Sequence, residues 1–131
     1  MTGLDTNVLV RYIMQDDVKQ SRQAAMIIES LTVDETGFVP LVAVIELVWV
    51  LSSSYGLARA QVVAALELLL RIKEIEVERA EVVWRAVRVY RDSSADFAHC
   101  LIERSAVAAG CARTMTFDHG AAKSCSMTLI Q

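Results

Sequence analysis

The sequence has no apolar run long enough to cross a membrane. Its longest, residues 41–51, is interrupted by Glu46, whereas a membrane-spanning helix needs about 20 apolar residues. No basic residue precedes the apolar stretch in residues 1–9, so the start of the chain does not resemble a signal peptide. The three cysteines lack the paired short spacing of a disulfide framework or a zinc site. These absences predict a cytoplasmic protein, not a membrane protein, with reduced and mostly buried thiols.

The chain also has no excess of basic charge. Its 13 Lys and Arg residues against 16 Asp and Glu residues give a net charge of −3, which argues against a protein that holds nucleic acid by bulk charge alone. This charge does not exclude an enzyme that acts on nucleic acid through a metal ion. With 131 residues, of which 54% are hydrophobic, and no repeats or linkers, the sequence predicts one domain, residues 1–131, with a substantial core.

Short apolar strands alternate with longer amphipathic helices along the chain. The pattern predicts strands that end near residues 5, 39, 77, 116 and 130, and helices near residues 7–14, 20–31, 40–53, 58–71, 81–91 and 96–109, with a short helix after residue 118. This alternation indicates an α/β sandwich around a short, mostly parallel sheet of about five strands. Ligands of such sheets bind beyond the carboxyl ends of the strands, so acidic residues at those ends are candidates for a site.

Three aspartates stand where helices are predicted to begin. Asp5 follows the first strand, Asp118 follows the fourth, and Asp96 precedes the long helix of residues 96–109. Each has two interpretations. It is either a helix cap that accepts backbone N–H bonds or a member of an acidic site.

Glu46 lies within an apolar helix and therefore needs its own explanation. Its helical neighbours three and four residues away are Val42, Ala43, Trp49 and Val50. A glutamate among them would be a buried charge unless it meets a metal ion, a cation or water. The alternative is a helix end or crevice that lets Glu46 reach solvent.

Carboxylates that gather in one cleft repel one another and need a cation to stay ionised together. Oxygen ligands suit Mg²⁺ or Mn²⁺, and one or two such ions serve phosphoryl transfer by activating a water molecule. The hypothesis is therefore that Asp5, Glu46, Asp96 and Asp118 converge on one cleft at the carboxyl ends of the strands. Arg11, on the helix after Asp5, is expected to border that cleft.

Four segments of the chain, in order, resemble the motifs of PIN domains. They are residues 4–9 (LDTNVL), residues 44–51 (VIELVWVL) with 55–57 (YGL), residues 95–98 (ADFA) leading to 109–111 (AGC), and residues 114–118 (TMTFD). The opening triplet alone would be a weak signal, but four ordered segments that cover the whole chain are a specific one. The chain resembles the VapC-type toxins of bacterial toxin–antitoxin pairs.

The resemblance implies a three-layer α/β/α sandwich and Mg²⁺- or Mn²⁺-dependent cleavage of RNA. It also implies a homodimer and a small cognate antitoxin that silences the enzyme. By resemblance, Asp5, Glu46 and Asp118 match the acidic pocket, and Asp5, Asp96 and Asp118 are the expected metal ligands. The polar residues expected beside them are Thr6, Asn7, Thr116 and His99.

His99 departs from the family pattern, which commonly has an aspartate three residues after the position of Asp96. Because one helical turn separates the two positions, both are expected on one face of the helix. Asp96 could supply the third carboxylate, His99 could be a nitrogen ligand, or His99 could simply pair with Glu103, four residues on. The alternative function is a PIN-like module that binds antitoxin or RNA without cleaving it.

Two other phosphate-handling classes are disfavoured. Response-regulator receivers need paired acids after the first strand and an aspartate in mid-chain, but this chain has only Asp5 there and no aspartate between Asp34 and Asp92. Haloacid-dehalogenase-like phosphatases need Asp-x-Asp after the first strand, and here the third residue is Asn7.

Overall fold

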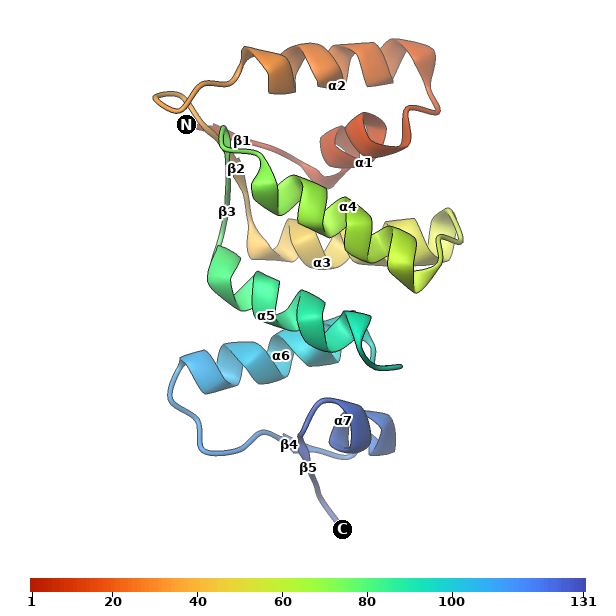
Figure 1. Ribbon diagram of the computed structural model, residues 1–131, viewed down its shortest axis with the longest axis vertical. Coiled ribbons are helices and arrows are strands. Elements are labelled where there is room, and N and C mark those ends of the chain that lie inside the picture. Colours follow the sequence, from red (N-terminus) through yellow and green to blue (C-terminus); the bar gives the residue numbers. More distant parts are fainter. The chain divides into compact units, whose positions relative to one another are not determined.

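Five short strands pair in parallel in the computed structural model, which describes residues 1–131 (Figure 1). Strands β1 (Thr2–Gly3), β2 (Gly37–Val39) and β3 (Ile75–Val77) form one sheet in that order. Strands β4 (Met115–Thr116) and β5 (Thr128–Leu129) form a second sheet. Helices flank these short parallel sheets, so the predicted α/β class is confirmed. The strands nevertheless form a three-stranded and a two-stranded sheet where the sequence predicted one of about five strands.

The chain divides into two compact units, unit 1 (Met1–Ala80) and unit 2 (Glu81–Gln131). Unit 1 holds the three-stranded sheet and unit 2 the two-stranded sheet. The expectation of one domain over residues 1–131 stays a prediction.

In unit 1, pairs of helices connect successive parallel strands. They are α1 (Thr6–Met14) and α2 (Val18–Ser30) between β1 and β2, and α3 (Leu41–Trp49) and α4 (Arg59–Arg71) between β2 and β3. Helix α1 packs against both α2 and α3 (Figure 1). Parallel strands need such crossovers, because a tight hairpin turn joins only antiparallel strands.

Side-chain caps begin helices α1 and α2, and a change from α-helical to π-helical hydrogen bonding ends α3. The side chain of Asp5 accepts a hydrogen bond at the start of α1, and that of Asp17 does so at the start of α2. The predicted helix of residues 40–53 does not run on as an α-helix. It ends at Trp49 and continues as a π-helical turn, η1 (Val50–Ser54), in which the backbone N–H of Tyr55 bonds the carbonyl of Val50 at 3.1 Å. Such turns occur frequently at functional sites.

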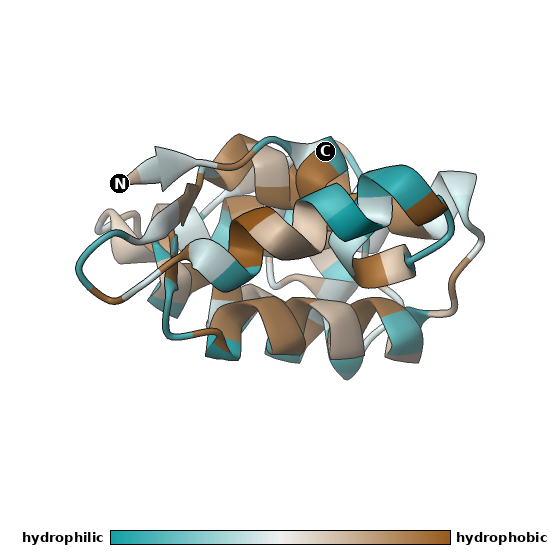
Figure 2. Cartoon of the chain, turned by 90° about the horizontal axis from the view of Figure 1, so that it is seen from above, coloured by the Kyte–Doolittle hydropathy of each residue, from teal (hydrophilic) through white to brown (hydrophobic).

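Apolar side chains on one face of each helix build the core. In unit 1, side chains from β2, α3, η1 and α4 are fully buried, among them Val39, Val44, Leu47, Leu51, Val62 and Leu66. Figure 2 shows hydrophobic and hydrophilic segments interleaved along the helices, as expected of helices with one buried face. No helix has the length and apolar character that crossing a membrane would require.

Unit 2 is built on α5 (Ala80–Arg91, which begins at the last residue of unit 1), α6 (Phe97–Ala108) and α7 (His119–Ser124). The ring of Phe97 meets that of Tyr90 edge-on, with centroids 5.6 Å apart. The thiols of Cys100 and Cys125 are buried with their sulfur atoms 3.7 Å apart, whereas Cys111 is exposed. Two of the three thiols are therefore buried, as predicted.

Candidate metal centre

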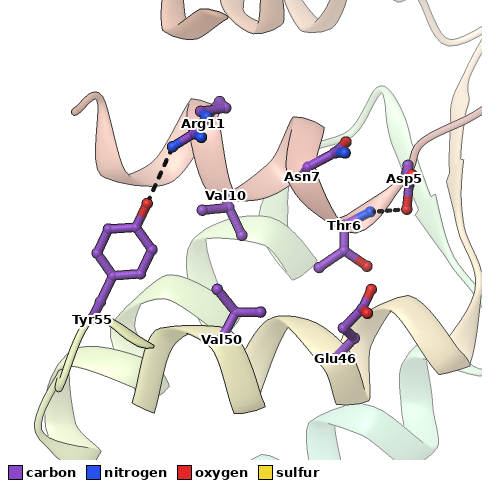
Figure 3. A pocket seen from close by; sticks show the side chains of 8 residues that line it. All are labelled: Asp5, Thr6, Asn7, Val10, Arg11, Glu46, Val50 and Tyr55. Carbon is purple, nitrogen blue, oxygen red and sulfur yellow. Dashed lines mark hydrogen bonds between the residues drawn. The ribbon is translucent and has the colours of Figure 1, made fainter. Parts of the chain in front are cut away.

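Asp5 and Glu46 face the same cavity in unit 1 (Figure 3). Asp5 lies at the junction of β1 and α1. Glu46 lies in the middle of α3, and the side chain of Glu46 points toward α1. The cavity has a volume of about 370 Å³, and Thr6, Asn7 and Arg11 of α1 also line it. A second cavity of about 220 Å³ shares Asp5, Thr6 and Glu46 with the first. Two carboxylates that are 41 positions apart in the sequence thus border one hollow.

The two carboxylates differ in what they bind within the chain. Asp5 Oδ1 accepts the backbone N–H of Thr6 at 2.7 Å, so the cap interpretation is confirmed for this residue. Glu46 accepts no hydrogen bond from the chain. Thr6 itself is buried, at 5% exposed, and its side chain points from α1 toward α3. One carboxylate is therefore held in place, and the other has both oxygens available.

Glu46 is exposed, so the second of its two interpretations holds. Helix α3 buries Val44 and Leu47 on its other side, whereas Val42 and Trp49 are 73% and 63% exposed. Glu46 is therefore not a buried charge, because two of its apolar neighbours, Val42 and Trp49, face solvent while Ala43 is buried. The 54%-hydrophobic composition leaves apolar side chains on both sides of this helix, so periodicity alone did not show which side is buried.

A polar cluster of Arg11, Asp16, Gln20 and Tyr55 stands at the other end of the main cavity. The Nη1 atom of Arg11 donates to Asp16 Oδ1 and to the Tyr55 hydroxyl, each at 3.3 Å, and its Nε donates to Gln20 Oε1 at 2.7 Å. The Tyr55 hydroxyl in turn donates to Asp16 Oδ2 at 2.8 Å. The expectation that Arg11 borders the cleft is confirmed for this cavity.

Sequence reasoning missed Asp16 and Tyr55, which belong to segments far apart in the chain. Their hydrogen bond lowers the pKa of Asp16 below its ordinary value, with a further contribution from the charge of Arg11. The same bond raises the pKa of the Tyr55 phenol. The only available signal was the tyrosine of residues 55–57, which the motif comparison used without giving it a role.

Asp96 and Asp118 cap two helices of unit 2. One oxygen of Asp96 accepts the N–H of Ala98 at 3.0 Å, and Asp118 Oδ1 accepts the N–H of Ala121 at 2.7 Å. The hydroxyl oxygen of Thr116 accepts the backbone N–H of Asp118 at 3.0 Å. The cap interpretation is thus confirmed for these two aspartates as well, and each has a second oxygen available.

The two aspartates share an electrostatic neighbour in Cys125. Burial raises the pKa of the Cys125 thiol, the contact with Cys100 lowers it, and the negative charges of Glu103, Asp96 and Asp118 raise it further. Both carboxylates of Asp96 and Asp118 therefore lie within electrostatic range of one buried thiol.

His99 is half-buried on α6, one turn from the cap residue Asp96. Its expected partner Glu103 is engaged elsewhere. The guanidinium of Arg104 holds both carboxylate oxygens of Glu103, with Nη2 2.7 Å from Oε2. This pair raises the pKa of Arg104. The structure therefore shows no pairing of His99 with Glu103.

Neither unit by itself gathers three or more His, Cys, Asp or Glu side chains into a metal-binding group. Unit 1 contributes Asp5 and Glu46 to one cavity, and unit 2 contributes Asp96 and Asp118 to the surroundings of Cys125. Convergence of all four on one cleft stays a prediction.

Comparison with known families identifies the class of protein. The model of the PIN domain family matches residues 4–125. The chain therefore belongs to the PIN domain family, whose members are typically metal-dependent nucleases. No curated protein and no solved structure matches the chain.

Proposed function

We propose that this chain is a cytoplasmic ribonuclease that uses Mg²⁺ or Mn²⁺ to hydrolyse phosphodiester bonds in RNA. The observation that carries the proposal is the pair of carboxylates, Asp5 and Glu46, that face one cavity of a PIN domain. Two like charges beside one hollow favour a cation between them, because each raises the cost of ionising the other.

The donor set of this cavity fits a hard divalent ion. Mg²⁺ is commonly held by one or two carboxylates together with water and substrate phosphates. Asp5 offers one oxygen in a direction fixed by its bond to Thr6, and Glu46 offers two. When bound, such an ion activates a water molecule and stabilises negative charge on the scissile phosphate. Asp5 and Glu46 would hold it, and the polar side chains of Thr6 and Asn7 would orient the attacking water or the substrate.

Asp96 and Asp118 are proposed as the further acidic residues, with Thr116 and His99 beside them. Their place in the third and fourth PIN motifs supports this, as does the second oxygen that each aspartate has available. Thr116 supports Asp118 by accepting its backbone N–H. The metal ligands proposed are Asp5, Asp96 and Asp118, with Glu46 as the fourth catalytic carboxylate.

The test is RNA cleavage during titration with Mg²⁺ and with Mn²⁺, for the native chain, Asp5→Asn and Glu46→Gln. Both variants keep the shape of the side chain and remove one negative charge. We expect each to lose about 100-fold or more in cleavage rate, the scale seen when a group that stabilises a charged transition state is removed. Asp34→Asn, an exposed aspartate outside the cavities, is the matched control. A native chain that binds neither ion, or that cleaves equally in chelator, would contradict the proposal.

We also propose that the chain is the toxin of a VapC-type pair, forms a homodimer and is silenced by a small cognate antitoxin. The acidic cavity of an acidic protein supports a partner that brings Arg or Lys to it. Light scattering on the isolated chain tests the dimer, and a monomer at all concentrations would refute it. Antitoxin binding that is unchanged in Asp5→Ala plus Glu46→Ala would show that the antitoxin does not use this cavity.

A further inference from the structure

Three cavities follow helix α1 in unit 1 and share lining residues. The cavity of about 220 Å³ near α3 shares Asp5, Thr6 and Glu46 with the main cavity of about 370 Å³. The main cavity shares Asn7 and Arg11 with a third, of about 220 Å³, between α1 and α2. Asp5 and Glu46 therefore lie where the cavity near α3 meets the main cavity, and Arg11 lies where the main cavity meets the cavity between α1 and α2. This arrangement suits an extended ligand.

The guanidinium of Arg11 is fixed in place and keeps unused donors. A guanidinium has five N–H groups in a rigid fork. Nε is used by Gln20, and Nη1 by Asp16 and Tyr55. The Nη2 atom has no partner in the chain. Arg11 thus connects α1 to Tyr55, lines two cavities and still has unpaired N–H groups. A purely structural role would explain the first feature but not the other two.

The distance along α1 separates Arg11 from the acids. Arg11 follows Asp5 by six residues, which is about 9 Å along a helix axis that rises 1.5 Å per residue. The Arg11 guanidinium also turns toward Tyr55, away from Asp5 (Figure 3), so the two ends of the cavity can hold different phosphate groups of one ligand. The neighbouring phosphate of the same strand is the anion that an extended RNA would place there.

We propose that Arg11 binds the phosphate next to the scissile one in a single-stranded RNA lying along α1. The proposal rests on the proposed function for the identity of the scissile phosphate. The unused N–H groups of Nη2 form charge-assisted hydrogen bonds to the phosphate oxygens. Asp16 and Tyr55 are positioning residues, since each accepts a bond from Nη1 and thereby orients the fork. Arg11 thus acts in substrate binding and not in the chemical step.

The first test measures RNA binding without cleavage. The dissociation constant of a short fluorescent single-stranded RNA is determined in chelator, over a series of salt concentrations, for the native chain, Arg11→Gln and Arg11→Lys. We expect Arg11→Gln to bind about 10-fold more weakly and to reduce the slope of log K against log salt by about 0.7, the value for one phosphate contact on a single strand. Arg11→Lys should keep the native slope but bind more weakly than native, because lysine lacks the fork.

Arg22→Gln is the matched control for these measurements. Arg22 is exposed on α2, lies outside all three cavities and carries the same charge. If Arg11→Gln changes the affinity and the slope no more than Arg22→Gln does, the proposal is overturned. A native chain without measurable affinity for RNA would overturn it equally.

The second test separates binding from chemistry in the presence of metal ion. Arg11→Gln should raise KM with kcat nearly unchanged, and Tyr55→Phe should raise KM by a smaller factor, because it removes only the hydroxyl that orients Arg11. An equal fall of kcat in both variants would mean that the cluster acts on the chemical step, contrary to the proposal. RNA binding that depends on Arg11 in a chain that never cleaves would sustain the contact of Arg11 with an RNA phosphate while refuting the proposed function.

Discussion

The two units of this chain present their acidic side chains differently. In unit 1, Asp5 and Glu46 come from different elements and border one cavity, and Glu46 accepts no bond from the chain. In unit 2, Asp96 and Asp118 both give an oxygen to a helix cap. A capped carboxylate is held in a fixed direction, whereas an unbonded one can adapt to a ligand. Within unit 1, the cavity therefore combines a carboxylate in a fixed direction, Asp5, with one that can move, Glu46.

The units also differ in how much apolar side chain they bury. The larger set of buried hydrophobic residues belongs to unit 1, and the smaller unit 2 includes two thiols, Cys100 and Cys125, among its buried side chains. Phe97 of unit 2 is the largest fully buried side chain, so its truncation leaves a larger cavity than truncation of a buried leucine of unit 1. Unit 2 should therefore be the more sensitive of the two to a cavity in its core.

The largest expected effect is a loss of stability upon truncation of one core side chain in each unit. Leu47→Ala in unit 1 should cost about 2–5 kcal/mol, and Phe97→Ala in unit 2 about 3–5 kcal/mol, because each removes a fully buried side chain. Phe97→Ala also removes the edge-on contact with Tyr90. Hydrogen exchange resolved along the sequence measures both effects. We expect Phe97→Ala to abolish protection in unit 2 and Leu47→Ala only to lower it in unit 1. The reverse result would contradict the comparison of the two cores.

The next effect concerns His99, where unit 2 lacks an acid that relatives commonly have. If Asp96 cannot fully replace that carboxylate, the site has one negative charge fewer and holds a hard ion less tightly. His99→Asp should then strengthen Mg²⁺ binding by about tenfold, the scale of one supporting ligand, and raise cleavage. Metal titration by calorimetry and a cleavage assay on the same variant measure the two quantities.

Asp96→Ala shows which residue of this helical turn carries the role. Equal activity of the native chain and His99→Asp, with Asp96→Ala inactive, would show that Asp96 suffices and that His99 is a bystander. Activity that survives Asp96→Ala would remove Asp96 from the site. If His99 is itself a ligand, the site should prefer Mn²⁺ to Mg²⁺, since imidazole suits transition metals.

The sequence predicted most of the elements because local signals agreed with one another. Strand β3 ends at Val77, where a strand end was predicted, and helix α4 begins one residue after its predicted start. The aspartates that begin helices were identified from capping preference, and Asp5, Asp96 and Asp118 do cap. The π-helical turn was not predicted, because it depends on how residues 50–54 fit the end of α3 and not on a local propensity.

The candidate site was predicted in part. Asp5 and Glu46 were placed in one cleft from strand ends and motif spacing, and they do border one cavity. The exposure of Glu46 was not predicted, because an apolar helix does not show from its sequence which face is covered. The cluster of Arg11, Asp16 and Tyr55 could not be derived either, since its members meet only after η1 brings Tyr55 back to the turn between α1 and α2.

The smallest expected effect is the pH dependence of that cluster. The hydrogen bond from Tyr55 to Asp16, together with the charge of Arg11, holds the pKa of Asp16 below its ordinary value of 3.8. A carboxylate with a lowered pKa in the folded chain contributes stability that is complete above the unfolded pKa and disappears as the pH falls through the folded one. The native chain should therefore be more stable than Asp16→Asn at neutral pH, and the two should begin to converge only as the pH falls below about 4. Because Asp16 is on the surface, solvent screens the interaction and the difference should be small. Thermal unfolding of both chains over a pH series measures it, with Asp34→Asn as the control for an exposed aspartate. If the difference in stability stays the same in acid, the charge of Asp16 is not its cause. Asp16 would then stabilise the chain through hydrogen bonds that are lost in Asp16→Asn.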